Sequence, residues 1–252
     1  MRVADPNLPR QRFDQALVAR GLVVSRARAR DLILRGLVSI DGRIVTKPAM
    51  PVDAANLLAV ADGAGDYVSR GALKLRAALK HFKVDPAGVV ALDIGASTGG
   101  FTEVLLELGA SRVYAVENGT NQLHERLRAD NRVVSLERTD ARRLDRQVVP
   151  EPIGAIVADV SFISLTKALP ASLALAVAGS WSIALVKPQF EGEPGGVPRD
   201  GVVKDEQART AAIERVAHFL EAAGWRVLGS MPSPIDGGDG NVEFLIGAVL
   251  DG

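Results

Sequence analysis

The feature that most constrains the fold of this chain is an apolar run that leads directly into a glycine-rich turn. Residues 89–94 predict a buried strand, residues 95–100 (Gly-Ala-Ser-Thr-Gly-Gly) a tight loop, and residues 101–108 a helix. A second strand over residues 112–116 ends at Glu117, 22 positions after the first loop glycine. This order of strand, loop, helix and spaced acid is typical of α/β units that bind nucleotide-like ligands.

Strands and helices continue to alternate after this unit, which predicts an α/β fold with a doubly wound, mostly parallel sheet. The remaining strands are expected at residues 133–136, 155–158, 183–186, 225–228 and 244–249. We expect the last strand to be antiparallel, because the chain turns back after the strand that precedes it. Its start would then lie at the edge where the other strands end, which is where doubly wound sheets bind their ligands.

The glycine loop narrows the choice of ligand. A dinucleotide site needs glycine at the third loop position, which is Ser97 in this chain. The pattern is similar to the S-adenosylmethionine loop of class I methyltransferases, in which an acid at the third strand lies near the adenine. The methyl donor is therefore favoured, with a nicotinamide cofactor as the alternative. The candidate donor-binding residues are Asp93, Gly95, Ala96, Ser97, Gly99, Gly100, Glu117 and Asp140.

Four charged residues stand where a doubly wound sheet places its reacting groups. Asp159 and Lys187 each follow a predicted strand, and Glu243 precedes the last one. Lys74 lies on the helix before the first strand, where we expect it on the side away from the apolar residues. Because a lysine is costly to bury unpaired, Lys187 is expected beside an acid. Each residue alone would suggest a surface salt bridge, but the convergence of all four favours a catalytic site.

The first sixty residues carry a different signal, which is positive charge. They hold ten basic and five acidic residues, and nine of the ten bases are arginine, although the whole chain has no net charge. Arginine suits forked contacts with phosphate, so this asymmetry indicates a polyanionic partner. A merely basic surface is the alternative. Two short helices are predicted, the second capped by Ser25 and running from Arg26 to about Arg35, and a hairpin is predicted around Asp41-Gly42.

This segment resembles the S4 RNA-binding domain. The matching positions include Arg12-Phe13-Asp14, Leu17, Gly21-Leu22, Ser25-Arg26, Ala29, Leu32-Ile33, Gly36, Asp41-Gly42 and Lys47-Pro48. The resemblance implies that Arg12, Ser25, Arg26 and Arg30 contact RNA, which such domains read by shape and phosphates. A polar, glycine-containing stretch follows, so we expect a domain over residues 1–60, a linker over 61–68 and a second domain over 69–252.

A second resemblance spans nearly the whole chain. Its motifs are Ser69-Arg70-Gly71 with Lys74, Asp93 with the loop through Thr102, Asp159 through Ser164, Lys187 through Glu191, and Gly240 through Glu243. These resemble the TlyA family, often labelled hemolysin, which joins an S4 domain to an FtsJ-like methyltransferase domain. The implied architecture is a small α+β domain followed by a Rossmann-like class I methyltransferase domain. The chain differs from the family pattern at Glu117, where Asp is usual, and at Asn118 and Asn121.

The resemblance also implies an activity, namely 2′-O-methylation of ribosomal RNA, typically at cytidine, with S-adenosylmethionine as the donor. Ribosomal RNA and ribosomal subunits would be the partners. The tetrad would be Lys74, Asp159, Lys187 and Glu243. Lys187 would contact the ribose hydroxyl and deprotonate or polarise it, while Lys74 would favour proton loss and the acids would hold both lysines. A purely orienting role for Lys187 is the alternative.

Composition and motifs argue against several other classes of protein. The chain has no cysteine and only three widely spaced histidines, so no metal site is expected. The polar start lacks a signal peptide, and no apolar run is long enough for a bilayer, so a cytoplasmic protein without membrane contact is expected. A pseudouridine synthase, or another RNA-modifying enzyme with an S4 domain, is a rival that the glycine loop opposes. A membrane-active hemolysin or cytotoxin is the second rival. Nothing in the sequence sets the oligomeric state.

Overall fold

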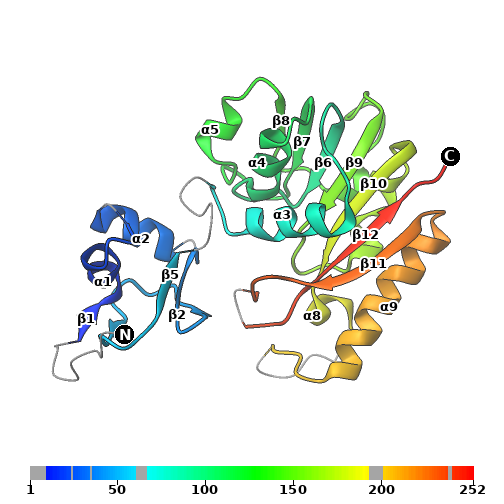
Figure 1. The fold of residues 1–252 in the computed structure, drawn as a ribbon. Coiled ribbons are helices and arrows are strands. Elements are labelled where there is room, and N and C mark those ends of the chain that lie inside the picture. Colours follow the sequence, from blue (N-terminus) through cyan, green and yellow to red (C-terminus); the bar gives the residue numbers. More distant parts are fainter. Residues whose placement is uncertain (1–9, 24, 35, 61–66, 193–200, 238–239) are drawn as a thin grey trace. The chain divides into compact units, whose positions relative to one another are not determined.

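The computed structural model describes residues 10–23, 25–34, 36–60, 67–192, 201–237 and 240–252. The chain divides into two compact units, Met1–Arg70 and Gly71–Gly252, which are described separately (Figure 1). Most of the predicted linker, residues 61–66, lies outside the described residues.

The first unit is a small α+β domain, as predicted. Its elements are β1 (Gln11–Arg12), α1 (Phe13–Ala19), α2 (Arg26–Leu34), β2 (Val38–Ile40), β3 (Arg43–Ile44), β4 (Pro51–Val52) and β5 (Leu58–Val60). Both helices contribute fully buried side chains, including Phe13 and Leu17 from α1 and Ile33 from α2. The paired helices form the core of this unit, because these apolar side chains recur at helical spacing.

Two local signals in the first unit are confirmed. The hydroxyl of Ser25 accepts a hydrogen bond from the Arg28 backbone nitrogen at 3.2 Å, so it caps α2 as expected. Strands β2 and β3 form an antiparallel hairpin in which Ile40 faces Arg43. The two turn residues, Asp41 and Gly42, both have positive φ, at 50° and 78°. A two-residue hairpin with this backbone is the one that an Asp-Gly pair favours.

The second unit is built on a seven-stranded sheet in the order β11-β12-β10-β9-β6-β7-β8. Its strands are β6 (Val90–Ile94), β7 (Arg112–Val116), β8 (Val133–Leu136), β9 (Ile153–Ala158), β10 (Ala176–Val186), β11 (Arg226–Pro232) and β12 (Phe244–Val249). The helices are α3 (Gly71–Phe82), α4 (Gly100–Glu107), α5 (Glu125–Arg128), η1 (Ala141–Arg143), α6 (Leu165–Ala168), α7 (Pro170–Leu173), α8 (Pro188–Glu191) and α9 (Glu206–Ala222).

Strand alternation shows that helices cover both faces of this sheet. A side chain at Gly247 of β12 would collide with the Phe82 ring of α3, since its Cβ would lie 2.7 Å from the ring. The neighbouring Ile246 instead joins a buried cluster with Val216 and Leu220 of α9. Because successive residues of a strand face opposite ways, α3 and α9 pack on opposite faces. The doubly wound α/β class is therefore confirmed.

The direction of the strands decides where the site can lie. Strands β6 to β10 are parallel, and β12 pairs antiparallel with both β10 and β11. Val186 at the end of β10 faces Phe244 at the start of β12. Glu243 is therefore brought to the edge where the parallel strands end, as the sequence predicts.

Candidate active site

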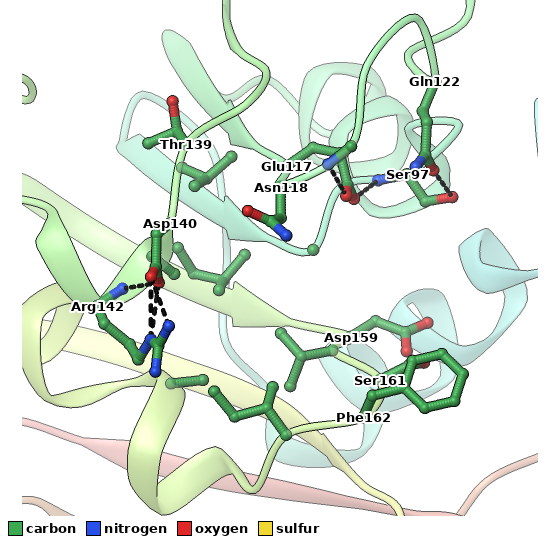
Figure 2. Close-up of a pocket in the computed structure, with 18 residues that line it drawn as sticks. Ser97, Glu117, Asn118, Gln122, Thr139, Asp140, Arg142, Asp159, Ser161 and Phe162 are labelled. Carbon is green, nitrogen blue, oxygen red and sulfur yellow. Dashed lines mark hydrogen bonds and ion pairs between the residues drawn. The ribbon is translucent and has the colours of Figure 1, made fainter.

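A cavity of about 630 Å³ opens at the carboxyl edge of the sheet in the second unit. Its walls come from the ends of β6, β7, β8 and β9 and the loops that follow them. Figure 2 shows Glu117 and Ser97 on one side, Asp140 and Arg142 on another, and Asp159 with Ser161 on a third. The volume is in the range of pockets that hold a ligand of nucleotide-like size.

The glycine turn forms one wall because two of its residues adopt backbone conformations that favour glycine. Gly95 has a φ of 81°, and a Cβ at this position would lie only 2.6 Å from the carbonyl oxygen of Asp159. Gly99 has a φ of 98° and precedes the first residue of α4. The turn can therefore pass close to the end of β9, and Gly95 and Ser97 of the turn line the cavity.

Two acids at the ends of β7 and β8 line the cavity. Glu117 accepts hydrogen bonds from the backbone nitrogens of Ser97 at 3.0 Å and Gly119 at 2.8 Å. A carboxylate has about four acceptor positions, so Glu117 keeps capacity for ligand hydroxyls. Asp140 is held by the Arg142 side chain at 2.7 Å, and this hydrogen-bonded pairing lowers the pKa of Asp140 to about 2. Both side chains present fixed acceptors to the cavity.

Asp93, unlike the acids Glu117 and Asp140, does not line the cavity. It is completely buried, and one oxygen accepts from the Thr102 backbone nitrogen at 2.8 Å and from the Thr102 hydroxyl at 2.6 Å. Burial, opposed by these hydrogen bonds, raises the pKa of Asp93 to about 7, and the carboxylates of Asp159 and Glu117 add to the rise. Asp93 thus ties β6 to α4 from behind the turn.

The eight predicted donor residues, all of which lie in the described part of the chain, divide into two groups. Gly95, Ser97, Glu117 and Asp140 line the cavity, whereas Asp93, Ala96, Gly99 and Gly100 lie behind its wall. Sequence reasoning missed several polar or aromatic side chains that also line it, namely Asn118, Gln122, Thr139, Arg142, Ser161 and Phe162. Arg142 could have been found from its two-residue spacing to Asp140, but the others follow strand ends in irregular loops.

Lys187 has the acidic partner that the sequence predicts. Its Nζ lies 2.6 Å from Asp159 Oδ1, in an ion pair without hydrogen-bond geometry, and donates a hydrogen bond to Ser161 Oγ at 2.9 Å. The side chains of Lys187 and Asp159 are 11% and 25% exposed. Both Asp159 and Ser161 line the cavity, so the ammonium group that contacts them stands at its border.

A second lysine–acid pair lies deeper in the molecule. Lys74 Nζ donates to Glu243 Oε2 at 2.5 Å, and the two side chains are 5% and 4% exposed. Lys74 is as buried as Leu79 of the same helix, which the helix pattern in the sequence does not predict. Burial is possible because Glu243 compensates the charge. Gly237 packs against Glu243, leaving no space for a side chain.

In the first unit, a buried acid forms hydrogen bonds with two of the predicted RNA-binding arginines. Asp14 is 3% exposed and accepts from Arg12 at 3.0 Å and Arg26 at 3.1 Å. The hydrogen bond from Arg12, aided by Arg26, lowers the pKa of Asp14. Arg30 is exposed and has no ion-pair partner among the described residues, and Ser25 is used as the α2 cap.

The fold of the second unit indicates the class of protein. It matches a crystal structure of a SAM-dependent methyltransferase from Aquifex aeolicus, with a TM-score of 0.51, 21% identity, and coverage of 73% of this chain and 94% of that one. The architecture is therefore that of the α/β methyltransferases. The family model described as FtsJ-like methyltransferase matches residues 67–249, and that of the S4 domain matches residues 11–57.

Relatives that match nearly the whole of this chain define its family more closely. The chain is 47% identical to the 16S/23S rRNA (cytidine-2′-O)-methyltransferase TlyA of Mycobacterium tuberculosis over 94% of this chain and 89% of that protein. A solved structure from Streptococcus thermophilus that bears a hemolysin name has a TM-score of 0.73, 38% identity, and coverage of 96% of this chain and 89% of that one. This chain belongs to the FtsJ-like methyltransferase family and, within it, to the TlyA group with an N-terminal S4 domain.

No helix in the described ranges is long and apolar enough to span a bilayer. Within the same ranges, no group of three or more histidine, aspartate and glutamate side chains is arranged to hold a metal ion.

Proposed function

We propose that this methyltransferase moves the methyl group of S-adenosylmethionine to the 2′-hydroxyl of a cytidine ribose in ribosomal RNA. The observation that carries the proposal is the Lys187–Asp159 pair, which stands at the border of an acid-lined cavity beside the glycine turn. The family supplies the reaction class, and the 47% identity to the rRNA (cytidine-2′-O)-methyltransferase TlyA supports the substrate.

The cavity residues fit a nucleoside with a charged amino-acid tail. Glu117 stands at the end of β7 with free acceptor positions for ribose hydroxyls, and Asp140 stands at the end of β8 as an acceptor for an adenine amine. Gly95 lets the backbone approach the ligand closely. When bound, the donor supplies an activated methyl group on a sulfonium. The side chains of this chain supply its alignment.

The four charged residues have distinct tasks in this proposal. Lys187 contacts the 2′-hydroxyl and polarises it or takes its proton, and Asp159 fixes the Lys187 ammonium beside the cavity. The buried Lys74–Glu243 pair adjoins the carboxyl edge of the sheet, with Lys74 on α3 and Glu243 directly before β12. Alignment of hydroxyl and methyl group is the larger contribution, worth up to roughly 7–11 kcal/mol, while general-base help adds about 10²–10⁴-fold.

Substrate binding divides between the units. In this proposal Arg12, Arg26 and Arg30 of the first unit contact phosphates of folded RNA, and the pairing of Arg12 and Arg26 with Asp14 supports a fixed position for these two side chains. In the second unit, Phe162 is 91% exposed and lies 5.2 Å from the Phe190 ring. An exposed aromatic side chain beside the reacting group suits the stacking of an unpaired base. The natural partners would be ribosomal subunits in the cytoplasm.

The test sets two activities against each other. Purified protein is incubated with unmodified ribosomal subunits and radiolabelled S-adenosylmethionine, and in parallel with dye-loaded liposomes. The proposal requires label in ribosomal RNA and no leakage. Leakage without methyl transfer would instead assign the membrane activity that the hemolysin name suggests.

A further inference from the structure

Ser161 is a cavity residue to which the sequence motifs assign no role. It follows Asp159 by two positions, at the point where the chain leaves β9. The next residue, Phe162, has a φ of 65°, a conformation that non-glycine residues rarely adopt, so the loop reverses sharply there. This reversal follows Ser161 directly, and the Ser161 hydroxyl is in hydrogen-bond contact with Lys187.

The contacts of Lys187 leave one free direction for a substrate. An ammonium group has three N–H donors. One is directed at Ser161 Oγ, 2.9 Å away, and Asp159 Oδ1 occupies a second side at 2.6 Å. Because both partners line the cavity, the third donor is the one available to a ribose hydroxyl there.

The two partners differ in what they can do when Lys187 loses a proton. The Asp159 carboxylate only accepts hydrogen bonds, whereas a serine hydroxyl can both accept and donate. Ser161 can therefore accept from the ammonium and donate to the neutral amine. Three other acids near this edge have partners of their own: Glu243 binds Lys74, Glu191 of α8 accepts from the Leu165 backbone nitrogen at 2.8 Å, and Asp93, which faces Asp159 and has its pKa raised to about 7 by burial, accepts from Thr102. Ser161 is thus the observed partner of Lys187 that suits both protonation states.

We propose that Ser161 is a positioning residue that holds Lys187 Nζ at the reacting hydroxyl through both of its protonation states. The inference rests on the proposed 2′-O-methylation. In that step Lys187 first gives a proton to water. The ribose oxygen then bonds to the methyl carbon as the carbon–sulfur bond breaks, with that electron pair staying on sulfur. The hydroxyl proton passes to the neutral amine, and Ser161 turns from donor to acceptor as the ammonium forms again.

The test is the pH profile of methyl transfer by Ser161→Ala. Both protonation states of Lys187 lose their hydrogen bond to the Ser161 hydroxyl in this variant, so the amine is held less firmly at the reacting hydroxyl and the pH profile of kcat should differ from that of the parent protein. We expect kcat near neutral pH to fall about tenfold, with the KM for RNA and the Kd for the donor within about threefold. Ser161→Thr, which keeps the hydroxyl, should restore the rate and the profile. Ser111→Ala, at the opposite edge of the sheet, should match the parent protein.

Distinct results would overturn distinct claims. If the parent protein transfers no methyl group to ribosomal RNA, the proposed function itself fails. If it does, and Ser161→Ala keeps the parent kcat and pH profile, the role of Ser161 alone fails. A Ser161→Ala variant that only weakens donor binding would show that the hydroxyl serves the donor and not Lys187, and it too would refute the inference. Should the alanine variant misfold, Ser161→Cys, which keeps nearly the same shape but bonds only weakly, should lower kcat in the same direction by a smaller factor; an unchanged kcat would refute the role of the hydroxyl.

Discussion

The two lysine–acid pairs of the second unit have the same chemistry but differ in how far their side chains are exposed. Lys74 and Glu243 are 5% and 4% exposed, whereas Lys187 and Asp159 are 11% and 25% exposed and border the cavity. A fully buried pair is expensive to break, while a pair at the border of a cavity can contact a ligand there. We propose that the first pair maintains the structure of the site and that the second acts on the substrate.

The largest effect that would sharpen this comparison is on the rate. Lys187→Ala should cut methyl transfer by about 10²–10⁴-fold, because it removes the group at the hydroxyl. Donor affinity measured by calorimetry should stay within about threefold, since Lys187 is not part of the cavity wall. Lys167→Ala, an exposed lysine of α6, is the charge-matched control. Substantial residual transfer would assign activation of the hydroxyl to another residue.

The buried pair should show the next largest effect, and it should appear in stability. Glu243→Ala leaves Lys74 buried without its partner, which should lower the free energy of unfolding by about 3–5 kcal/mol. Asp159→Ala should cost less, because Asp159 is 25% exposed and Lys187 keeps its hydrogen bond to Ser161. Urea unfolding of both variants measures this. Equal losses would erase the distinction between the two pairs.

A substitution in the glycine turn tests whether Gly95 forms part of the donor site next to the Lys187–Asp159 pair. Gly95→Val should weaken donor binding at least about a hundredfold, because the new side chain meets the Asp159 carbonyl and fills ligand space. Gly179→Val isolates backbone strain, since Gly179 also has a positive φ but open space around its Cβ. Unchanged donor affinity in a folded Gly95→Val protein would remove the turn from the site.

The smallest effect concerns the first unit, where arginines again lie beside a buried acid. Replacing Arg26 and Arg30 by alanine should weaken RNA binding and flatten its salt dependence, with the slope falling by about one unit for each phosphate that is no longer bound. Binding titrations at several salt concentrations measure the slope. Arg226→Ala, which removes an arginine paired with Asp251 in the other unit, is the control. An unaltered slope in the double variant would contradict phosphate binding by these two side chains.

Several elements of the second unit could be predicted from the sequence alone. The strands over 112–116, 133–136 and 244–249 match the structure residue for residue, because each is a mostly apolar run between clear turn signals. An acid beside Lys187 could be predicted because a lysine that ends such a strand needs a partner. In these cases the determining signal lies within a few residues of the position.

Other contacts could not be predicted because they join distant parts of the chain. The burial of Lys74 depends on Glu243, which is 169 positions away, and the local helix pattern holds no trace of it. The bond from Lys187 to Ser161 depends on a loop whose reversal at Phe162 breaks the usual preference for negative φ. Asp93 matches a donor motif, yet its position behind the turn follows from packing against α4.

The most direct test of the central claim is to identify the modified nucleoside. Unmodified ribosomal subunits are incubated with S-adenosylmethionine and either the parent protein or Lys187→Ala, and the RNA is digested to nucleosides for mass spectrometry. The account predicts 2′-O-methylcytidine with the parent protein and a near-complete loss of it with the variant. Methylation on a base, or equal amounts of 2′-O-methylcytidine from both proteins, would contradict it.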